Sequence, residues 1–117
     1  MVKGQTQSRK IFYVEKVAFL RSMFETALKA RGAEIYTIDT MVNNFYLLED
    51  LKPELIIFDV QTVGDSLEAI LSYQTKAVLI ATGDESDRAQ VEGKVAHFVS
   101  KPIEAHKLGE FILSFLD

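Results

Sequence analysis

LIIFDV, residues 55–60, is an apolar run that contains a single charged side chain, the carboxylate of Asp59. A run this short and this rich in β-branched and aromatic side chains is typical of a strand buried on both faces, as in a parallel sheet between helices. We expect Asp59 to emerge at the carboxyl end of that strand, where ligands bind in open α/β sheets. A second interpretation is that Asp59 only caps the following turn.

Four other short apolar runs are also expected to be strands: residues 10–14, 34–38, 77–81 and 95–99. Segments with helical spacing separate them, and residues 61–66 are expected to form a loop. The expected helices span residues 17–31, a segment with Met41, Phe45 and Leu48, a short one with Leu67, Ile70 and Leu71, a marginal one over 84–94, and a last one with Leu108, Phe111, Ile112, Phe115 and Leu116. Five strands alternating with five helices predict an α/β fold, with a parallel sheet covered on both faces.

The length of the chain fits one domain. At 117 residues it has room for a single hydrophobic core, which we place at residues 10–117 after a flexible N-terminal tail at residues 1–9. The polar start lacks the apolar segment of a signal peptide, and no apolar run reaches the length of a membrane span. We therefore expect no membrane partner.

The composition narrows the location and the partners. The chain has no cysteine, which excludes disulfides and thiolate metal sites and fits a reducing cytoplasm. Its net charge is -4 and its Lys and Arg residues are scattered, whereas nucleic-acid binding normally needs a clustered basic face. We expect a cytoplasmic protein that does not bind nucleic acid.

Polar side chains follow four of the five expected strands. They are Glu15 and Lys16, then Asp59, Thr82 and Lys101. A carboxylate nucleophile, a lysine and a hydroxyl at one edge of a sheet suit phosphoryl transfer, in which catalysis is mostly positioning and charge neutralisation. A second acid nearby suits Mg²⁺, which prefers oxygen ligands.

From about Lys10 to the C-terminus, the chain resembles the receiver domains of two-component response regulators, including the chemotaxis regulators. The matching segments are IFYVE at 11–15, LIIFD at 55–59, VLIAT at 78–82 and FVSKP at 98–102. The resemblance implies a flavodoxin-like, doubly wound, five-stranded parallel sheet with strand order 2-1-3-4-5.

The resemblance also implies roles for single residues. Asp59 would accept a phosphoryl group from a histidine kinase or a phosphotransfer protein. Thr82 would supply the hydroxyl that moves onto that group, and Lys101 would be its ion-pair partner. Phe98 would be the aromatic switch, turning inward when Thr82 moves. Simpler interpretations remain for two of them: Lys101 as a solvated turn residue and Phe98 as plain core.

The expected metal site departs from the family pattern. Glu15, Asp59 and the main-chain carbonyl of Gln61 would bind Mg²⁺, but Lys16 stands where the family usually has a second acid. We expect the Lys16 ammonium to pair with the two carboxylates, and therefore expect weak Mg²⁺ affinity and slow or absent phosphorylation. The alternative is that Lys16 extends into solvent. His97 and His106 are expected at the surface, because two histidines alone do not make a zinc site.

These expectations favour one function over two others. The leading hypothesis is a stand-alone receiver in a phosphorelay, which is not an enzyme and signals by binding a downstream protein. The alternative is a degenerate pseudo-receiver that binds its partners independently of phosphorylation, a reading that Lys16 favours. A phosphatase of the haloacid dehalogenase type is disfavoured, because Gln61 replaces the second acid that those enzymes carry two residues after the nucleophile.

Overall fold

The computed structural model describes residues 9–116, except for the side chains of residues 105–107 and 116. The expected tail therefore lies outside the described residues, apart from Arg9. The strands form one parallel sheet in the order β2-β1-β3-β4-β5, as the resemblance implied. Their bounds are β1 Lys10–Val14, β2 Glu34–Ile38, β3 Leu55–Asp59, β4 Val78–Gly83 and β5 His97–Ser100.

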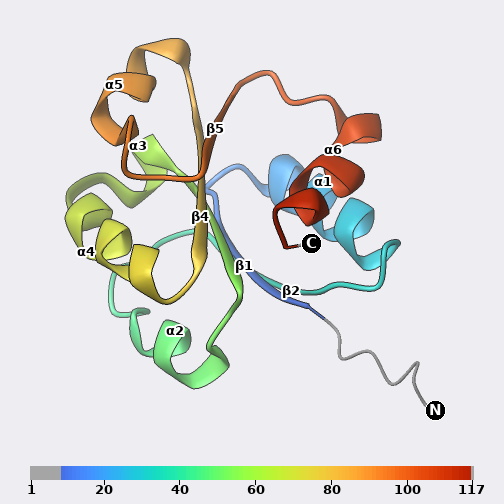
Figure 1. The fold of residues 1–117 in the computed structure, drawn as a ribbon, viewed down its shortest axis with the longest axis horizontal. Coiled ribbons are helices and arrows are strands. Elements are labelled where there is room, and N and C mark those ends of the chain that lie inside the picture. Colours follow the sequence, from blue (N-terminus) through green and yellow to red (C-terminus); the bar gives the residue numbers. More distant parts are fainter. Residues whose placement is uncertain (1–8, 117) are drawn as a thin grey trace.

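Helices cover both faces of this sheet, and α1 and α6 lie together on one side of it (Figure 1). Side chains alternate along the strands between the two faces. In β3, Leu55 and Ile57 contact the α1 and α6 side, whereas Ile56 and Phe58 contact the opposite side. All four are fully buried, which explains why this strand is an unbroken apolar run. The helices are α1 Ala18–Lys29, α2 Tyr46–Leu51, α3 Val60–Val63, α4 Leu67–Leu71, α5 Arg88–Val91 and α6 Ala105–Leu113.

Three expected elements differ from the structure. The segment predicted as a loop after β3 is helical, with α3 followed by a 3-10 turn at Gly64–Ser66, and Val60 begins α3 instead of ending the strand. The helix expected around Met41 begins only at Tyr46, because Asn43 adopts a left-handed backbone with a φ of 62°. The last strand begins at His97, two residues later than predicted.

The marginal helix predicted over residues 84–94 is indeed short. It consists of a 3-10 turn at Glu85–Asp87 followed by the four residues of α5. None of the helices in the described part of the chain is long and apolar enough to cross a bilayer.

Candidate functional site

The carboxyl ends of the central strands bring three polar side chains together. Glu15 directly follows β1, while Asp59 ends β3 and is paired in register with Thr82 of β4. The exposed fractions of the three are 0%, 3% and 1%, respectively. Buried carboxylates are stable only when they are paired or hydrogen-bonded, so the question is what compensates them.

Lys101 supplies most of that compensation. Its Nζ lies 2.9 Å from Glu15 Oε1 and 3.0 Å from Asp59 Oδ1, so one ammonium bridges both carboxylates. Its backbone N–H donates to the Gly83 carbonyl, which fixes the chain just past β5 beside the end of β4. Burial alone would lower the pKa of Lys101, but the hydrogen bonds and charges of the two carboxylates raise it above its ordinary value. Lys101 is therefore part of the site, and its interpretation as a solvated turn residue is wrong.

Glu15 is held by further donors from its own neighbourhood. The Tyr13 hydroxyl donates to Oε1 at 3.3 Å and the Val17 backbone N–H donates to Oε2 at 3.1 Å. Burial, together with the adjacent Glu15 charge, raises the pKa of Tyr13 well above its ordinary range, which keeps this hydroxyl a donor. Both carboxylate oxygens of Glu15 are thus engaged.

Asp59 is engaged at both oxygens as well. Its Oδ2 accepts from the Thr62 backbone N–H at 3.0 Å and from the Thr62 hydroxyl at 2.7 Å. Asp59 is therefore the N-cap of α3, so the capping interpretation is confirmed alongside the site interpretation. Sequence reasoning missed Thr62, although the spacing Asp-x-x-Thr is a possible capping signal.

Lys16 does not take the place expected for it. Its side chain is exposed, and its ammonium forms no ion pair with any carboxylate of the described residues, Glu15 and Asp59 included. Instead its backbone N–H donates to the Thr62 hydroxyl at 3.1 Å. The physical reason is that Lys101 already lies between the two carboxylates, and an exposed ammonium keeps its hydration. The expectation of a Lys16 ion pair is corrected, and the solvent-exposed alternative holds.

Thr82 is the exception among the buried polar groups of the site. Its hydroxyl has no hydrogen-bond partner among the described residues, although the side chain is almost fully buried next to Asp59. Unsatisfied buried hydroxyls are rare and often mark a place where a ligand atom binds.

Phe98 and Gln61 lie next to this group. The Phe98 ring is buried, and the Arg88 guanidinium carbon lies 4.8 Å from its centroid. That position fits both an inward-facing switch and a plain core residue. The Gln61 side chain is exposed, and its amide donates to Asp87 Oδ2 at 3.2 Å. His97 is exposed, as expected, while the side chain of His106 lies outside the described residues.

The donor atoms expected to bind Mg²⁺ are occupied by other groups. Glu15 Oε1 and Asp59 Oδ1 share the Lys101 ammonium, and Asp59 Oδ2 accepts two hydrogen bonds from Thr62. In the described residues no three His, Asp or Glu side chains form a metal-binding cluster. In this arrangement the site does not fit a resident Mg²⁺, because a cation and two donors already fill its place.

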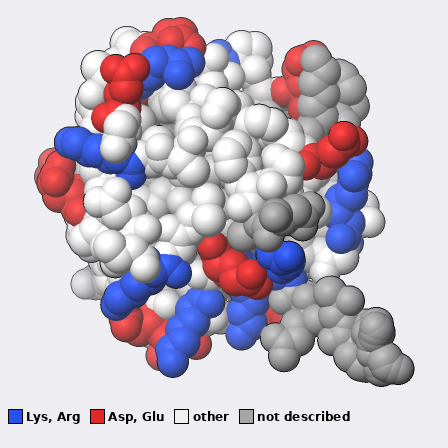
Figure 2. Space-filling view, in the orientation of Figure 1, with Lys and Arg blue, Asp and Glu red and all other residues white. Residues whose placement is uncertain are grey.

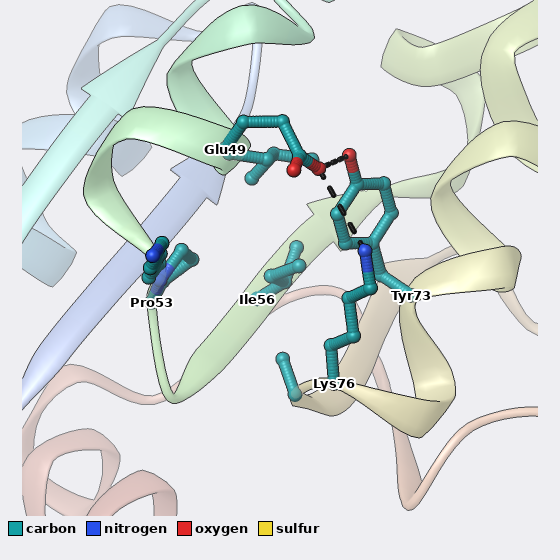
Figure 3. A pocket seen from close by; sticks show the side chains of 8 residues that line it. Glu49, Pro53, Ile56, Tyr73 and Lys76 are labelled. Atoms are coloured by element: carbon teal, nitrogen blue, oxygen red, sulfur yellow. Dashed lines mark hydrogen bonds and ion pairs between the residues drawn. The ribbon is translucent and has the colours of Figure 1, made fainter.

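A separate cavity of about 320 Å³ lies at the opposite, amino-terminal edge of the sheet, where Pro53 and Ile56 belong to its lining (Figure 3). Tyr73 donates to Glu49 Oε2 at 2.6 Å across its mouth, and the Lys76 ammonium lies 4.0 Å from the same oxygen. These groups satisfy one another, and none of them reaches the Asp59 cluster.

Comparison with known proteins supports the fold. None of the family models matches the chain, and neither does any curated sequence. Solved structures do match. The chemotaxis response regulator CheY4 of Vibrio cholerae is 16% identical, with a TM-score of 0.76 over 92% of this chain and 98% of that one. The receiver domain of a putative Luxo repressor protein from Vibrio parahaemolyticus is 21% identical, with a TM-score of 0.78 over 94% and 91%.

An orphan response regulator of H. pylori is also similar. It is 15% identical, with a TM-score of 0.81 over 94% of this chain and 98% of that one. The strand order, the parallel pairing and nearly complete mutual coverage agree in all these comparisons. The chain has the fold of the response-regulator receiver domains.

Proposed function

We propose that this chain is a signal receiver in which Asp59 accepts a phosphoryl group from a histidine kinase or a phosphotransfer protein. The observation that supports it best is the buried hydroxyl of Thr82, which lies beside Asp59 without a hydrogen-bond partner among the described residues. Leaving such a hydroxyl unsatisfied is unfavourable by about 1–3 kcal/mol. An oxygen of a phosphoryl group on Asp59 would accept its hydrogen bond and remove that penalty.

The reaction proposed is a direct displacement at phosphorus. One carboxylate oxygen of Asp59 attacks the phosphorus of a phosphohistidine or an acyl phosphate, and a new P–O bond forms. The bond from phosphorus to the donor's nitrogen or oxygen breaks, and the imidazole or carboxylate leaves with the electron pair. Lys101 neutralises charge on the transferred group, since its ammonium already lies 3.0 Å from Asp59 Oδ1. Mg²⁺ has no assigned part in this step, because the donor atoms for it are occupied.

Signalling through protein contacts follows from the same proposal. A phosphoryl group that recruits Thr82 and Lys101 would release Glu15 from its ion pair, and the loops after β1, β4 and β5 would adjust together. Phe98, on β5 next to Thr82 of β4, is the aromatic side chain placed to respond. We propose a downstream protein as the partner and the cytoplasm as the location. Figure 2 fits a protein partner, because basic and acidic side chains alternate around the periphery of the face it shows, without a continuous basic patch.

A second candidate is a receiver fold that works without phosphorylation. The specific observation in its favour is the closed ion pair, in which Lys101 gives both carboxylates a cation in the absence of a metal or phosphoryl group. In that case the partner surface would be constitutive.

The two candidates are separated by the intact mass of the protein after incubation with acetyl phosphate, with and without Mg²⁺. Our proposal predicts a gain of one phosphoryl group in the wild type and no gain in Asp59→Asn. Asp65→Asn is the matched control, because Asp65 is an exposed acid in the 3-10 turn after α3. A wild type that gains no mass under any condition supports the second candidate, and a gain that persists in Asp59→Asn contradicts the site.

A further inference from the structure

Thr62 connects two loops of the site through one hydroxyl group. The side chain is half-buried at the third residue of α3, and its Oγ1 contacts both Lys16 and Asp59. A hydroxyl has one proton to donate and two lone pairs that accept. The roles of its two contacts are therefore open to a simple argument.

The partner on one side fixes which way the proton points. The Lys16 contact is a backbone N–H, which can only donate, so Thr62 Oγ1 accepts there. Its proton is then free for Asp59 Oδ2 at 2.7 Å, a length typical of a strong hydrogen bond to a charged acceptor. The Thr62 backbone N–H adds a second bond to the same oxygen at 3.0 Å.

These bonds limit what the Asp59 carboxylate can do. A carboxylate has about four lone-pair sites, and here three are used, two by Thr62 and one by Lys101. A lone pair that accepts a strong hydrogen bond is not free to attack phosphorus or to bind a cation. Resting on the proposed function, we infer that Thr62 is a positioning residue that holds Asp59 Oδ2 in its capping geometry and restrains its reactivity toward a phosphoryl donor.

The inference assigns the restraint to the hydroxyl and not to the residue as a whole. Removing the hydroxyl leaves the backbone N–H bond and the cap of α3 in place. The Lys16 N–H then donates to water, since Lys16 is exposed. The main change at Asp59 is therefore one charge-assisted hydrogen bond fewer.

Three variants of the full chain test this inference. Thr62→Val removes the hydroxyl with little change in shape, and Thr62→Ser keeps it. Thr40→Val is the matched control, because the Thr40 hydroxyl also accepts from a backbone N–H, that of Val42, at 3.1 Å, but its only printed contact is remote from the carboxylates. Thermal unfolding checks that each variant folds.

The readouts are the rate of phosphorylation by acetyl phosphate and the affinity for Mg²⁺ alone, measured by calorimetry. We expect Thr62→Val to raise both by about 10-fold, the factor that corresponds to one charge-assisted hydrogen bond. Thr62→Ser and Thr40→Val should behave like the wild type. Equal or slower phosphorylation in Thr62→Val, or a rise in Thr62→Ser as large as in Thr62→Val, overturns the inference.

The Mg²⁺ arm separates this inference from the proposed function. If neither the wild type nor Thr62→Val gains a phosphoryl group, the proposed function fails. Tighter Mg²⁺ binding in Thr62→Val alone then still upholds the restraint by Thr62. Unchanged Mg²⁺ affinity in that variant rejects the restraint whatever the phosphorylation result.

Discussion

Replacing Lys101 with methionine tests whether the ammonium holds the site together. The variant keeps a long unbranched side chain but removes the cation that lies 2.9 Å from Glu15 Oε1 and 3.0 Å from Asp59 Oδ1. Removing one partner of a buried ion pair typically destabilises a protein by about 3–5 kcal/mol. The side chain of Lys101 is 23% exposed, so we expect the lower end, about 3 kcal/mol.

The assay is the urea dependence of unfolding. For a domain of this size the slope is of the order of 2 kcal/mol per molar urea, so the midpoint should fall by about 1.5 M. The matched control is Lys76→Met, which removes an ammonium 4.0 Å from Glu49 on the surface, where both side chains are more than half exposed. That control should lower the stability by no more than about 0.5 kcal/mol.

A second substitution checks the cause. Glu15→Gln in the Lys101→Met background removes one of the two uncompensated carboxylates, and part of the lost stability should return. A midpoint shift below about 0.3 M in Lys101→Met, or no recovery in the double variant, would refute the reasoning.

The pH dependence follows from the sign of the pKa change. The pKa of Lys101 in the folded protein is raised above the ordinary 10.5, although burial acts in the other direction. The ion pair therefore stabilises the wild type fully below that ordinary value, and this contribution is lost as the pH rises through the folded value. The deficit of Lys101→Met should instead shrink in acid, where protonation of a carboxyl group removes the repulsion.

Three other results are expected. Lys16→Ala should leave both stability and Mg²⁺ affinity within error of the wild type, as titration calorimetry and urea unfolding can show; tighter Mg²⁺ binding would restore Lys16 to the pocket. The hydrogen bond to Glu49 raises the pKa of Tyr73 to about 12, so in Glu49→Gln that phenol should titrate closer to 10 by ultraviolet absorbance; an unchanged titration would contradict the contact. Amides of Glu85–Val91 should exchange with solvent faster than those of α6, since only a four-residue helix and a 3-10 turn protect them; equal protection would show that this segment is as stable as the core.

The strands were predictable because burial on both faces leaves a direct mark on the sequence. The first two strands match their predicted ranges, and β3 differs only in that Val60 starts a helix. The prediction failed after Asp59, where the chain begins α3 at once. The Asp59 side chain caps that helix from inside the site, and a pattern of apolar residues does not report such a contact.

The candidate site was predictable in part for a similar reason. Parallel strands bring their carboxyl ends to one edge, so Glu15, Asp59 and Thr82 meet as expected. Which lysine enters the pocket is set by loop geometry. Lys101 is fixed by its backbone bond to Gly83, whereas the backbone of Lys16 is turned toward Thr62 and its side chain toward solvent. Spacing along the sequence does not distinguish these two outcomes.

The most direct test of the account is to locate the phosphoryl group chemically. Borohydride reduces an acyl phosphate of aspartate to homoserine, which peptide mass spectrometry can place in the sequence. After treatment of the wild type with acetyl phosphate, the account predicts homoserine at position 59 and at no other acid. Homoserine at another position, or none in a sample that has gained the mass of a phosphoryl group, would contradict it.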